Sequence, residues 1–192
     1  MISEIHPLSP FLPNNAKLLM LGSFPPPKKR WSMDFYYPNL INDMWRIFGI
    51  VFFTDKNYFF NQTKKEFCKE KIVEFLTAKG IALYDTAQVI RRQNDNASDK
   101  FLEVLQPTDI KSLLYKIPLC TTVCTTGEKA TDIFLQQIHI QKPKIGEFVD
   151  FQYNNRTMSF LRMPSSSRAY PLKLETKADI YAKMFERIEC FP

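Results

Sequence analysis

Histidine and paired cysteine are scarce in this chain of 192 residues. The two histidines, His6 and His139, stand in unrelated sequence contexts, and no C-x-x-C pair occurs. Zinc and iron–sulfur sites need a tighter cluster of such ligands, so we expect no metal site. The cysteines are Cys68, Cys120, Cys124 and Cys190. Because Cys120 and Cys124 fall within an apolar segment, we expect the cysteines to be core thiols.

Long hydrophobic runs are also missing. Charged residues interrupt every apolar stretch well before the roughly 20 residues that a membrane-spanning helix needs. Residues 1–4 lack the basic-then-apolar order of an export signal. We therefore expect a cytoplasmic protein with no membrane partner.

No polar low-complexity stretch divides the chain, and 45% of its residues are hydrophobic. A chain of this length and composition can bury one sizeable core. We therefore expect residues 1–192 to form a single domain.

Acidic residues are outnumbered, which gives a net charge of +6 and a pI of about 9.1. This excess favours a polyanionic partner such as nucleic acid. The cluster Lys28, Lys29 and Arg30 in a predicted loop is the best candidate for that contact. Solvated surface charge is the ordinary alternative, and we favour it for Lys64 and Lys65 on a predicted helix.

Apolar periodicity predicts alternating strands and helices. Runs of strand length cover residues 17–22, 81–84, 119–125 and 157–163. Helix-like spacing or composition covers residues 40–49, 64–79, 98–105, 127–138 and 175–188. Such alternation, with nearly continuous apolar strands, is typical of a sheet covered on both faces. The predicted fold class is α/β, a three-layer α/β/α sandwich with a short, mostly parallel central sheet.

Ligand sites in such sheets lie beyond the carboxyl ends of the strands. The predicted strand exits are Gly22-Ser23-Phe24-Pro25, Asp85-Thr86, Thr125-Thr126-Gly127-Glu128 and Pro164-Ser165-Ser166-Ser167-Arg168. All four are small, polar or loop-forming, so we expect functional residues there. By contrast, residues 140–156 are predicted to be a flexible connection because they are rich in Lys, Pro and Asn.

The first strand exit has the composition of a ligand loop. Gly22 allows a close backbone approach, and the prolines at 25–27 stiffen the chain. The aromatic residues nearby are Phe24, Tyr36, Tyr37 and Trp45. These aromatic residues suit stacking on a planar base, but so many aromatic residues close together are also typical of a hydrophobic core. Tyr37, beside Pro38 in the loop, is the best stacking candidate, and we assign Trp45 to the core.

Asn42 is expected to begin a helix whose first turn faces this exit. Its amide can orient a water molecule or hold a carbonyl edge of a ligand. The spacing alone favours the ordinary alternative, an asparagine that caps the helix or serves a turn. We assign the nearby Asn39 to the turn.

The later exits carry two more candidates. Asp85 ends a strand, where a carboxylate can activate water, bind a metal or cap the next turn, and capping is the favoured interpretation. Residues 164–168 offer hydroxyls, amides and one guanidinium that suit a phosphate, although serine clusters are also common in turns. No general base accompanies these serines, which argues against nucleophilic hydrolase chemistry.

Four segments resemble motifs of the uracil-DNA glycosylase superfamily, in particular its hypoxanthine (deoxyinosine) and mismatch-specific branches. The segments are Gly22-Ser23-Phe24-Pro25 with Tyr36, Tyr37, Asn42 and Trp45; Gly80-Ile81-Ala82-Leu83-Tyr84-Asp85; Thr126-Gly127-Glu128-Lys129-Ala130; and Met163-Pro164-Ser165-Ser166-Ser167. They follow the family's order over most of residues 15–185, one at each predicted strand exit.

This resemblance implies a monofunctional DNA glycosylase that hydrolyses the N-glycosidic bond of a flipped, deaminated base, uracil or hypoxanthine, in base-excision repair. It implies no cofactor, a monomer, and a DNA partner that contains a deaminated or mismatched base. The implied catalytic residues are Asn42 and Asp85. The implied base-binding residues are Gly22, Ser23, Phe24, Tyr37 and Thr126. The implied DNA contacts are Lys28, Lys29, Arg30, Pro164, Ser165, Ser166, Ser167 and Arg168.

The chain also departs from the family's motifs. Phe24 and Pro25 stand where other branches carry an asparagine or aspartate, and Thr126 stands where an asparagine is expected. The further departures are Pro26, Leu40, Ile41 and Arg168. They imply low catalytic power and leave two alternatives open: a non-catalytic nucleic-acid or nucleotide-binding member of the same fold, and an unrelated α/β hydrolase or transferase.

Overall fold

The computed structural model describes residues 3–93 and 99–188 of the chain. Its central sheet has five strands in the order β5-β2-β8-β10-β9. They are β2 (Leu18–Gly22), β5 (Ile81–Asp85), β8 (Thr122–Thr126), β9 (Phe148–Tyr153) and β10 (Arg156–Met163). The first four strands in this order are parallel, and β9 is antiparallel to β10.

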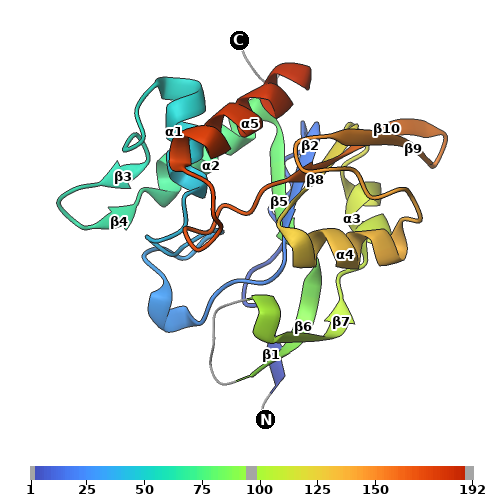
Figure 1. The fold of residues 1–192 in the computed structure, drawn as a ribbon, viewed down its shortest axis with the longest axis horizontal. Helices are drawn as coiled ribbons and strands as arrows, with labels where there is room; N and C mark the ends of the chain where they lie inside the picture. The colour runs from blue at the N-terminus through green and yellow to red at the C-terminus, as the bar shows by residue number, and fades with distance from the viewer. Residues whose placement is uncertain (1–2, 94–98, 189–192) are drawn as a thin grey trace.

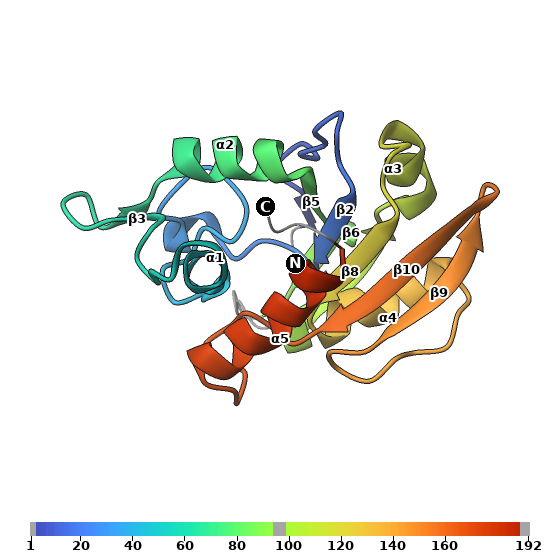
Figure 2. The same ribbon diagram turned by 90° about the horizontal axis from the view of Figure 1, so that it is seen from above.

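Helices cover both faces of this sheet (Figures 1 and 2). On one side are α1 (Met44–Phe53), α2 (Lys69–Lys79) and α5 (Leu174–Arg187). On the other are α3 (Ile110–Lys116) and α4 (Glu128–Gln137). Helix α5 packs on α1 through Phe48 and Phe185, whose ring centroids are 5.1 Å apart. The predicted three-layer α/β/α class is confirmed.

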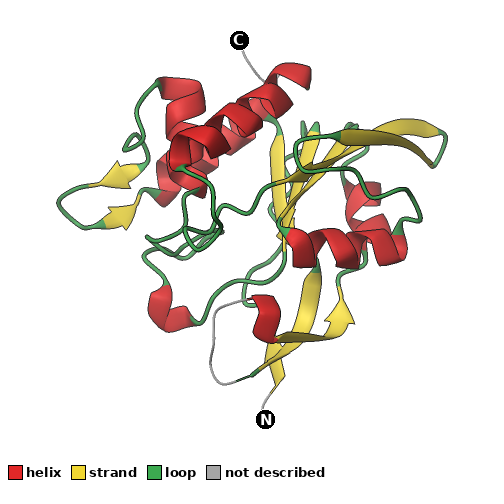
Figure 3. Cartoon of the chain, viewed as in Figure 1, coloured by secondary structure: helices red, strands yellow, loops and turns green. Residues whose placement is uncertain are grey.

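The strand register brings the predicted exits to one edge of the sheet. Gly22 pairs with Asp85 across β2 and β5, and Met163 pairs with Thr126 across β10 and β8. The loops that follow β2 and β10 then run toward the side of α1 and α5 (Figure 3). Backbone and side-chain groups from all four exits therefore meet at this edge.

A second, antiparallel sheet extends beyond the same edge. Its order is β1-β6-β7, formed by β1 (Ser3–Ile5), β6 (Ala87–Arg92) and β7 (Leu102–Pro107). A short hairpin joins β3 (Phe60–Asn61) to β4 (Glu66–Phe67), and single 3-10 turns form η1 (Lys28–Arg30) and η2 (Asp99–Phe101). The sequence did not predict this second sheet, the hairpin or α3.

Two predicted segments have a different structure. The helix expected over 98–105 is η2 followed by β7, because Leu102 is buried against Ala87 and Ile90 in an antiparallel pair. The flexible connection expected over 140–156 contains β9, whose Phe151 is buried in the core.

The other predicted helices differ mainly at their starts. The helix expected over 64–79 begins at Lys69, so Lys64 and Lys65 lie exposed in the turn between β3 and β4. The helix expected over 40–49 begins at Met44. The helices over 127–138 and 175–188 and the four strands agree with α4, α5 and the central sheet to within a few residues.

The cysteines are only partly core residues. Cys120 and Cys124 are fully buried, whereas Cys68 is half-buried just before α2, so the prediction for Cys68 is wrong. Cys190 lies outside the described residues. Among the described residues, no helix is both long enough and apolar enough to span a bilayer.

Candidate functional site

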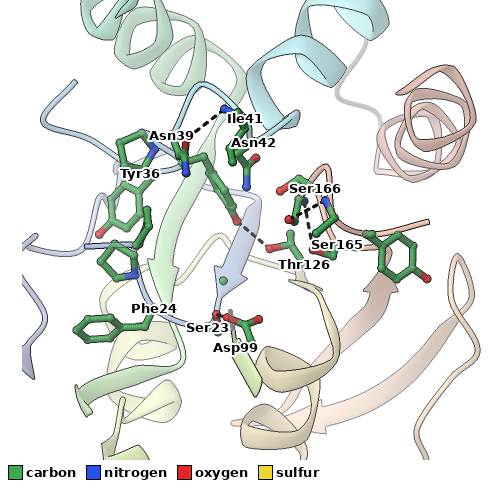
Figure 4. A pocket seen from close by; sticks show the side chains of 18 of the residues that line it. Ser23, Phe24, Tyr36, Asn39, Ile41, Asn42, Asp99, Thr126, Ser165 and Ser166 are labelled. Carbon is green, nitrogen blue, oxygen red and sulfur yellow. Dashed lines mark hydrogen bonds between the residues drawn. The ribbon is translucent and has the colours of Figure 1, made fainter. Parts of the chain in front are cut away.

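A cavity of about 490 Å³ lies where the strand exits meet. Its walls include every residue predicted to be catalytic or base-binding: Gly22, Ser23, Phe24, Tyr37, Asn42, Asp85 and Thr126. Of the predicted DNA contacts, Arg30, Ser165, Ser166 and Ser167 line it, whereas Lys28, Lys29, Pro164 and Arg168 do not. Figure 4 shows Asn42 across this cavity from Ser23 and Asp99.

Gly22 leaves room for a carboxylate. A Cβ atom at this position would lie 2.3 Å from Asp85 Oδ1 and 3.6 Å from the Tyr37 hydroxyl. The first distance is far below van der Waals contact, so no other residue fits here without moving Asp85. The group that approaches Gly22 closely is therefore the Asp85 side chain.

Asp85 forms a buried pair with a histidine from the N-terminal segment. His6 Nε2 lies 2.8 Å from Asp85 Oδ2, and both side chains are almost fully buried. The pairing of β1 with β6 carries His6 to this position. Among the described residues, the Thr86 and Ala87 N–H groups of the next turn donate to the Gly22 and Ser23 carbonyls, so the Asp85 carboxylate does not cap this turn and the capping interpretation is wrong. Sequence reasoning missed His6, and an isolated histidine 79 residues from its partner gives no local signal.

Tyr37 reaches the base of the cavity from a strained turn. Its φ is 49°, in the left-handed region, and its hydroxyl lies 2.9 Å from Thr126 Oγ1. Its ring packs edge-on against Trp45, which is buried as predicted. Burial, and then the negative charge of Asp85, hold the pKa of Tyr37 well above its ordinary value. Tyr37 is therefore a neutral phenol in any working range of pH.

A second carboxyl, that of Asp99, enters the cavity from η2. Its Oδ1 lies 2.6 Å from Ser23 Oγ. Burial raises the pKa of Asp99, the hydrogen bond from Ser23 opposes that shift, and the charge of Asp85 adds to it. The sequence missed Asp99 because residues 98–105 were assigned to an outer helix.

Asn42 accepts a bond from the first amide of α1, just before the N-cap residue Asp43, and also lines the cavity. Its Oδ1 accepts a hydrogen bond of 2.9 Å from the Met44 N–H. That bond fixes Nδ2 as the free end of the amide, which lines the cavity (Figure 4). The bond to the start of the helix and the cavity position are therefore both realised, and Asn39 serves the turn by accepting a bond of 3.1 Å from the Ile41 N–H.

The serine loop is tied to the Asn42 loop. Asn42 forms a bridge with Ser167, and the Asp43 N–H donates to Ser166 O at 2.8 Å. The buried Asp43 carboxylate accepts from Arg168 Nε at 2.9 Å and from Lys177 Nζ at 3.1 Å. Arg168 thus links the serine loop to Asp43 outside the cavity, and its side chain is still about half exposed.

The basic cluster lies at one side of the cavity opening. Arg30 lines the cavity. Lys28 forms an exposed ion pair with Asp34 and places its ammonium 4.0 Å from the centre of the Trp31 ring. In the part of the chain that the structure describes, no group of three or more His, Cys, Asp or Glu side chains is arranged to hold a metal ion.

No protein-family model and no curated protein matches the chain. The structure is similar to the solution NMR structure of a Methanosarcina acetivorans protein that is provisionally described as a uracil DNA glycosylase, with a TM-score of 0.64. The match covers 95% of this chain and 96% of that chain at 20% sequence identity. The likeness shows a shared fold, in agreement with the α/β architecture.

Proposed function

We propose that the protein is a monofunctional DNA glycosylase that hydrolyses the N-glycosidic bond of a flipped, deaminated base, uracil or hypoxanthine, in base-excision repair. One observation carries the proposal: Tyr37 and Asn42 converge on the cavity that Gly22 opens. The fold shared with a protein provisionally described as a uracil DNA glycosylase supports it.

The cavity has the features that an extruded base needs. Enzymes that act on a base inside a duplex must rotate the nucleotide out of the stack into a pocket that supplies stacking and hydrogen bonds. Phe24 and Tyr37 offer aromatic surface, and the Asn42 amide nitrogen offers a donor to a base carbonyl. Ser23 and Thr126 add hydroxyls.

Asp85 is the group best suited to stabilise the positive charge that develops on the sugar. As the bond to the base breaks, the sugar gains positive charge and a water molecule must attack it. An anionic carboxylate stabilises that charge and accepts a hydrogen bond from the water. His6 holds Oδ2, and Oδ1 lies beside Gly22 at the cavity wall. The Asn42 Oδ1 atom is already bonded to Met44, so its amide acts as a donor.

DNA contacts are proposed on both sides of the opening. Lys28, Lys29 and Arg30 supply positive charge on one side, and residues 164–168 supply backbone amides, hydroxyls and the Arg168 guanidinium on the other. Phosphates bind to such groups without reading sequence. This arrangement suits a single domain that acts as a monomer on damaged DNA without a cofactor.

The test is base release from oligonucleotides that carry one uracil or one inosine, followed by alkali cleavage of the abasic sites. We expect strand breaks with the wild-type protein. Asp85→Asn should reduce the rate by about 100-fold or more, and Asn42→Ala by about 10-fold to 100-fold, because removal of one transition-state contact has effects of this size. No breaks on either substrate would overturn the proposal.

A non-catalytic nucleic-acid or nucleotide-binding role is the second candidate. The bond from the Met44 N–H to Asn42 Oδ1 favours it, because it occupies one of the two acceptor positions of the amide oxygen that would orient a water molecule. A pure binder would show salt-sensitive affinity for DNA and release no base. Base release that depends on Asp85 would exclude it.

A further inference from the structure

The cavity contains one acidic group that no predicted motif includes. Asp99 lies on η2, outside the central sheet, and its Oδ1 is 2.6 Å from Ser23 Oγ. Ser23 directly follows Gly22, so Asp99 stands beside the residues proposed to contact the base. Figure 4 shows it opposite Asn42, at the other end of the cavity.

The surroundings of Asp99 favour its neutral form. Burial raises its pKa most, and Asp85 on β5 raises it further. Ser23, Lys129 on α4 and Arg92 on β6 act in the opposite sense. Arg92 also donates to Glu4 and to Pro25 O, which draws its charge toward those groups. The net direction is a raised pKa, and a protonated carboxyl is an O–H donor.

Such a donor would assist a glycosylase reaction. The departing base takes the bonding electron pair, and two ionised carboxylates in one cavity would oppose that negative charge. Pairs of carboxyl groups held in different protonation states commonly divide the acid and base roles of a site. Asp85, bonded to His6, suits the anionic role, which leaves the acid role to Asp99.

We propose that Asp99 is the general acid that protonates the departing base. This inference rests on the proposed glycosylase activity. In the step, the bond between the sugar C1′ and the base nitrogen breaks, its electron pair goes to the base, and the Asp99 proton passes to the base. Water held by Asp85 then adds to C1′ and gives its proton to the Asp85 carboxylate, and exchange of protons with solvent returns Asp85 to its anionic form and a proton to the Asp99 carboxylate. The Ser23 hydroxyl donates to that carboxylate while it is ionised.

The leaving group gives the sharpest test. Single-turnover release would be measured for uracil and for 5-fluorouracil, which leaves more easily, from otherwise identical oligonucleotides. Asp99→Asn should slow uracil release by about 100-fold, the usual scale for loss of a general acid. It should slow 5-fluorouracil release much less. Glu103→Gln, at an exposed carboxylate on β7, is the matched control and should change neither rate.

The pH profile gives an independent readout. The wild-type rate should fall as pH rises through the pKa of Asp99, and Asp99→Asn should lack that fall. Ser23→Ala should move the fall to higher pH, because the Ser23 bond lowers the pKa of Asp99. Thermal melting checks that the variants are folded. It also tests the raised pKa of Asp99: the wild type should lose stability as Asp99 ionises, so Asp99→Asn should become more stable relative to the wild type as pH increases.

The outcomes separate this inference from the function on which it rests. A wild-type protein that releases neither base overturns both. A wild-type protein that releases uracil, with Asp99→Asn slowing both bases equally or not at all, overturns the acid role alone. Selective loss on uracil supports it.

Discussion

The cavity has two kinds of wall, and they use polar residues differently. The paired loops, residues 39–43 and 164–168, direct their charged groups away from the cavity and into each other: Asp43 binds Arg168 and Lys177. The acidic floor, formed by Ser23, Asp85 and Asp99, directs its polar groups into the space. We propose that the first region supplies shape and that the second supplies the reactive groups.

This difference matters because the resemblance placed function in both regions. In the paired loops, the residues that matched the motifs make structural bonds. Asn42 bonds the first amide of α1, and Arg168 is bonded to Asp43. In the acidic floor, the partners that complete the site are His6 and Asp99, which belong to no motif. The motifs therefore predicted where the cavity lies, but they did not include His6 and Asp99, which complete its acidic floor.

The largest effect is expected in the paired loops, from Asp43→Ala. Among the described residues, the change leaves the fully buried Lys177 ammonium with the Ser167 carbonyl as its one remaining partner, and breaking a buried ion pair costs about 3–5 kcal/mol of unfolding free energy. Urea denaturation followed by circular dichroism measures it. The double variant Asp43→Ala/Lys177→Met should lose much less than the single one. A single-variant loss under about 1 kcal/mol would show that the network does not hold the wall.

The acidic floor should respond to Gly22→Ala with a loss of activity. The new Cβ displaces Asp85 Oδ1, and a misplacement of about 1 Å commonly costs about 100-fold in rate. The control is Gly49→Ala, where a Cβ would lie equally close, 2.3 Å, to Asp55 O but away from the cavity. Both variants should lose stability, and only Gly22→Ala should lose base release at temperatures where it remains folded. Equal rates for the two would contradict the role of the close approach.

His6→Phe tests whether the bond from His6 stabilises Asp85 in the acidic floor. The ring contacts with Phe24 and Tyr84 can be kept, but the Asp85 carboxylate loses its buried partner, which costs about 1–3 kcal/mol. Thermal and urea unfolding measure the loss. Adding Asp85→Leu to this variant should restore much of the stability, because the unpaired carboxylate is then removed. No recovery would mean that His6 contributes through packing and its bond to the Leu8 backbone, and not through Asp85.

The smallest effect is expected outside both walls, at the basic cluster. Arg30→Gln should reduce the slope of log affinity for DNA against log salt by about 1, as expected for loss of one phosphate contact. Lys28→Gln should change it less, because Lys28 is already paired with Asp34. Fluorescence anisotropy over a salt series distinguishes the two. Unchanged slopes for both would remove this surface from the DNA interface.

The central fold was predictable because its strands carry strong local signals. Residues 18–21 and 81–84 are apolar throughout, as is typical of strands buried on both faces. The edge elements were not: β9 and β7 are largely exposed or half-buried, and polar residues interrupt their apolar runs. Their structure depends on partners, β10 and β6, that no local pattern specifies.

The site was predictable to the same extent. Gly22, Tyr37 and Asn42 follow or precede elements with clear signals, so their convergence follows from the topology. Asp99, on η2 just before β7, lines the cavity, and His6, just after β1, bonds Asp85 from outside it; both positions depend on the second sheet, which the sequence did not predict. The bond between His6 and Asp85 joins two residues whose pairing depends wholly on tertiary structure.

The most direct test of the central claim is a crystal structure with a DNA duplex that contains 2′-fluoro-2′-deoxyuridine, whose fluorine slows cleavage. The account predicts the uracil ring inside the cavity, against Tyr37, with a base carbonyl within hydrogen-bond distance of Asn42 Nδ2. A uracil that stays stacked in the duplex, or that binds elsewhere on the protein, would contradict it.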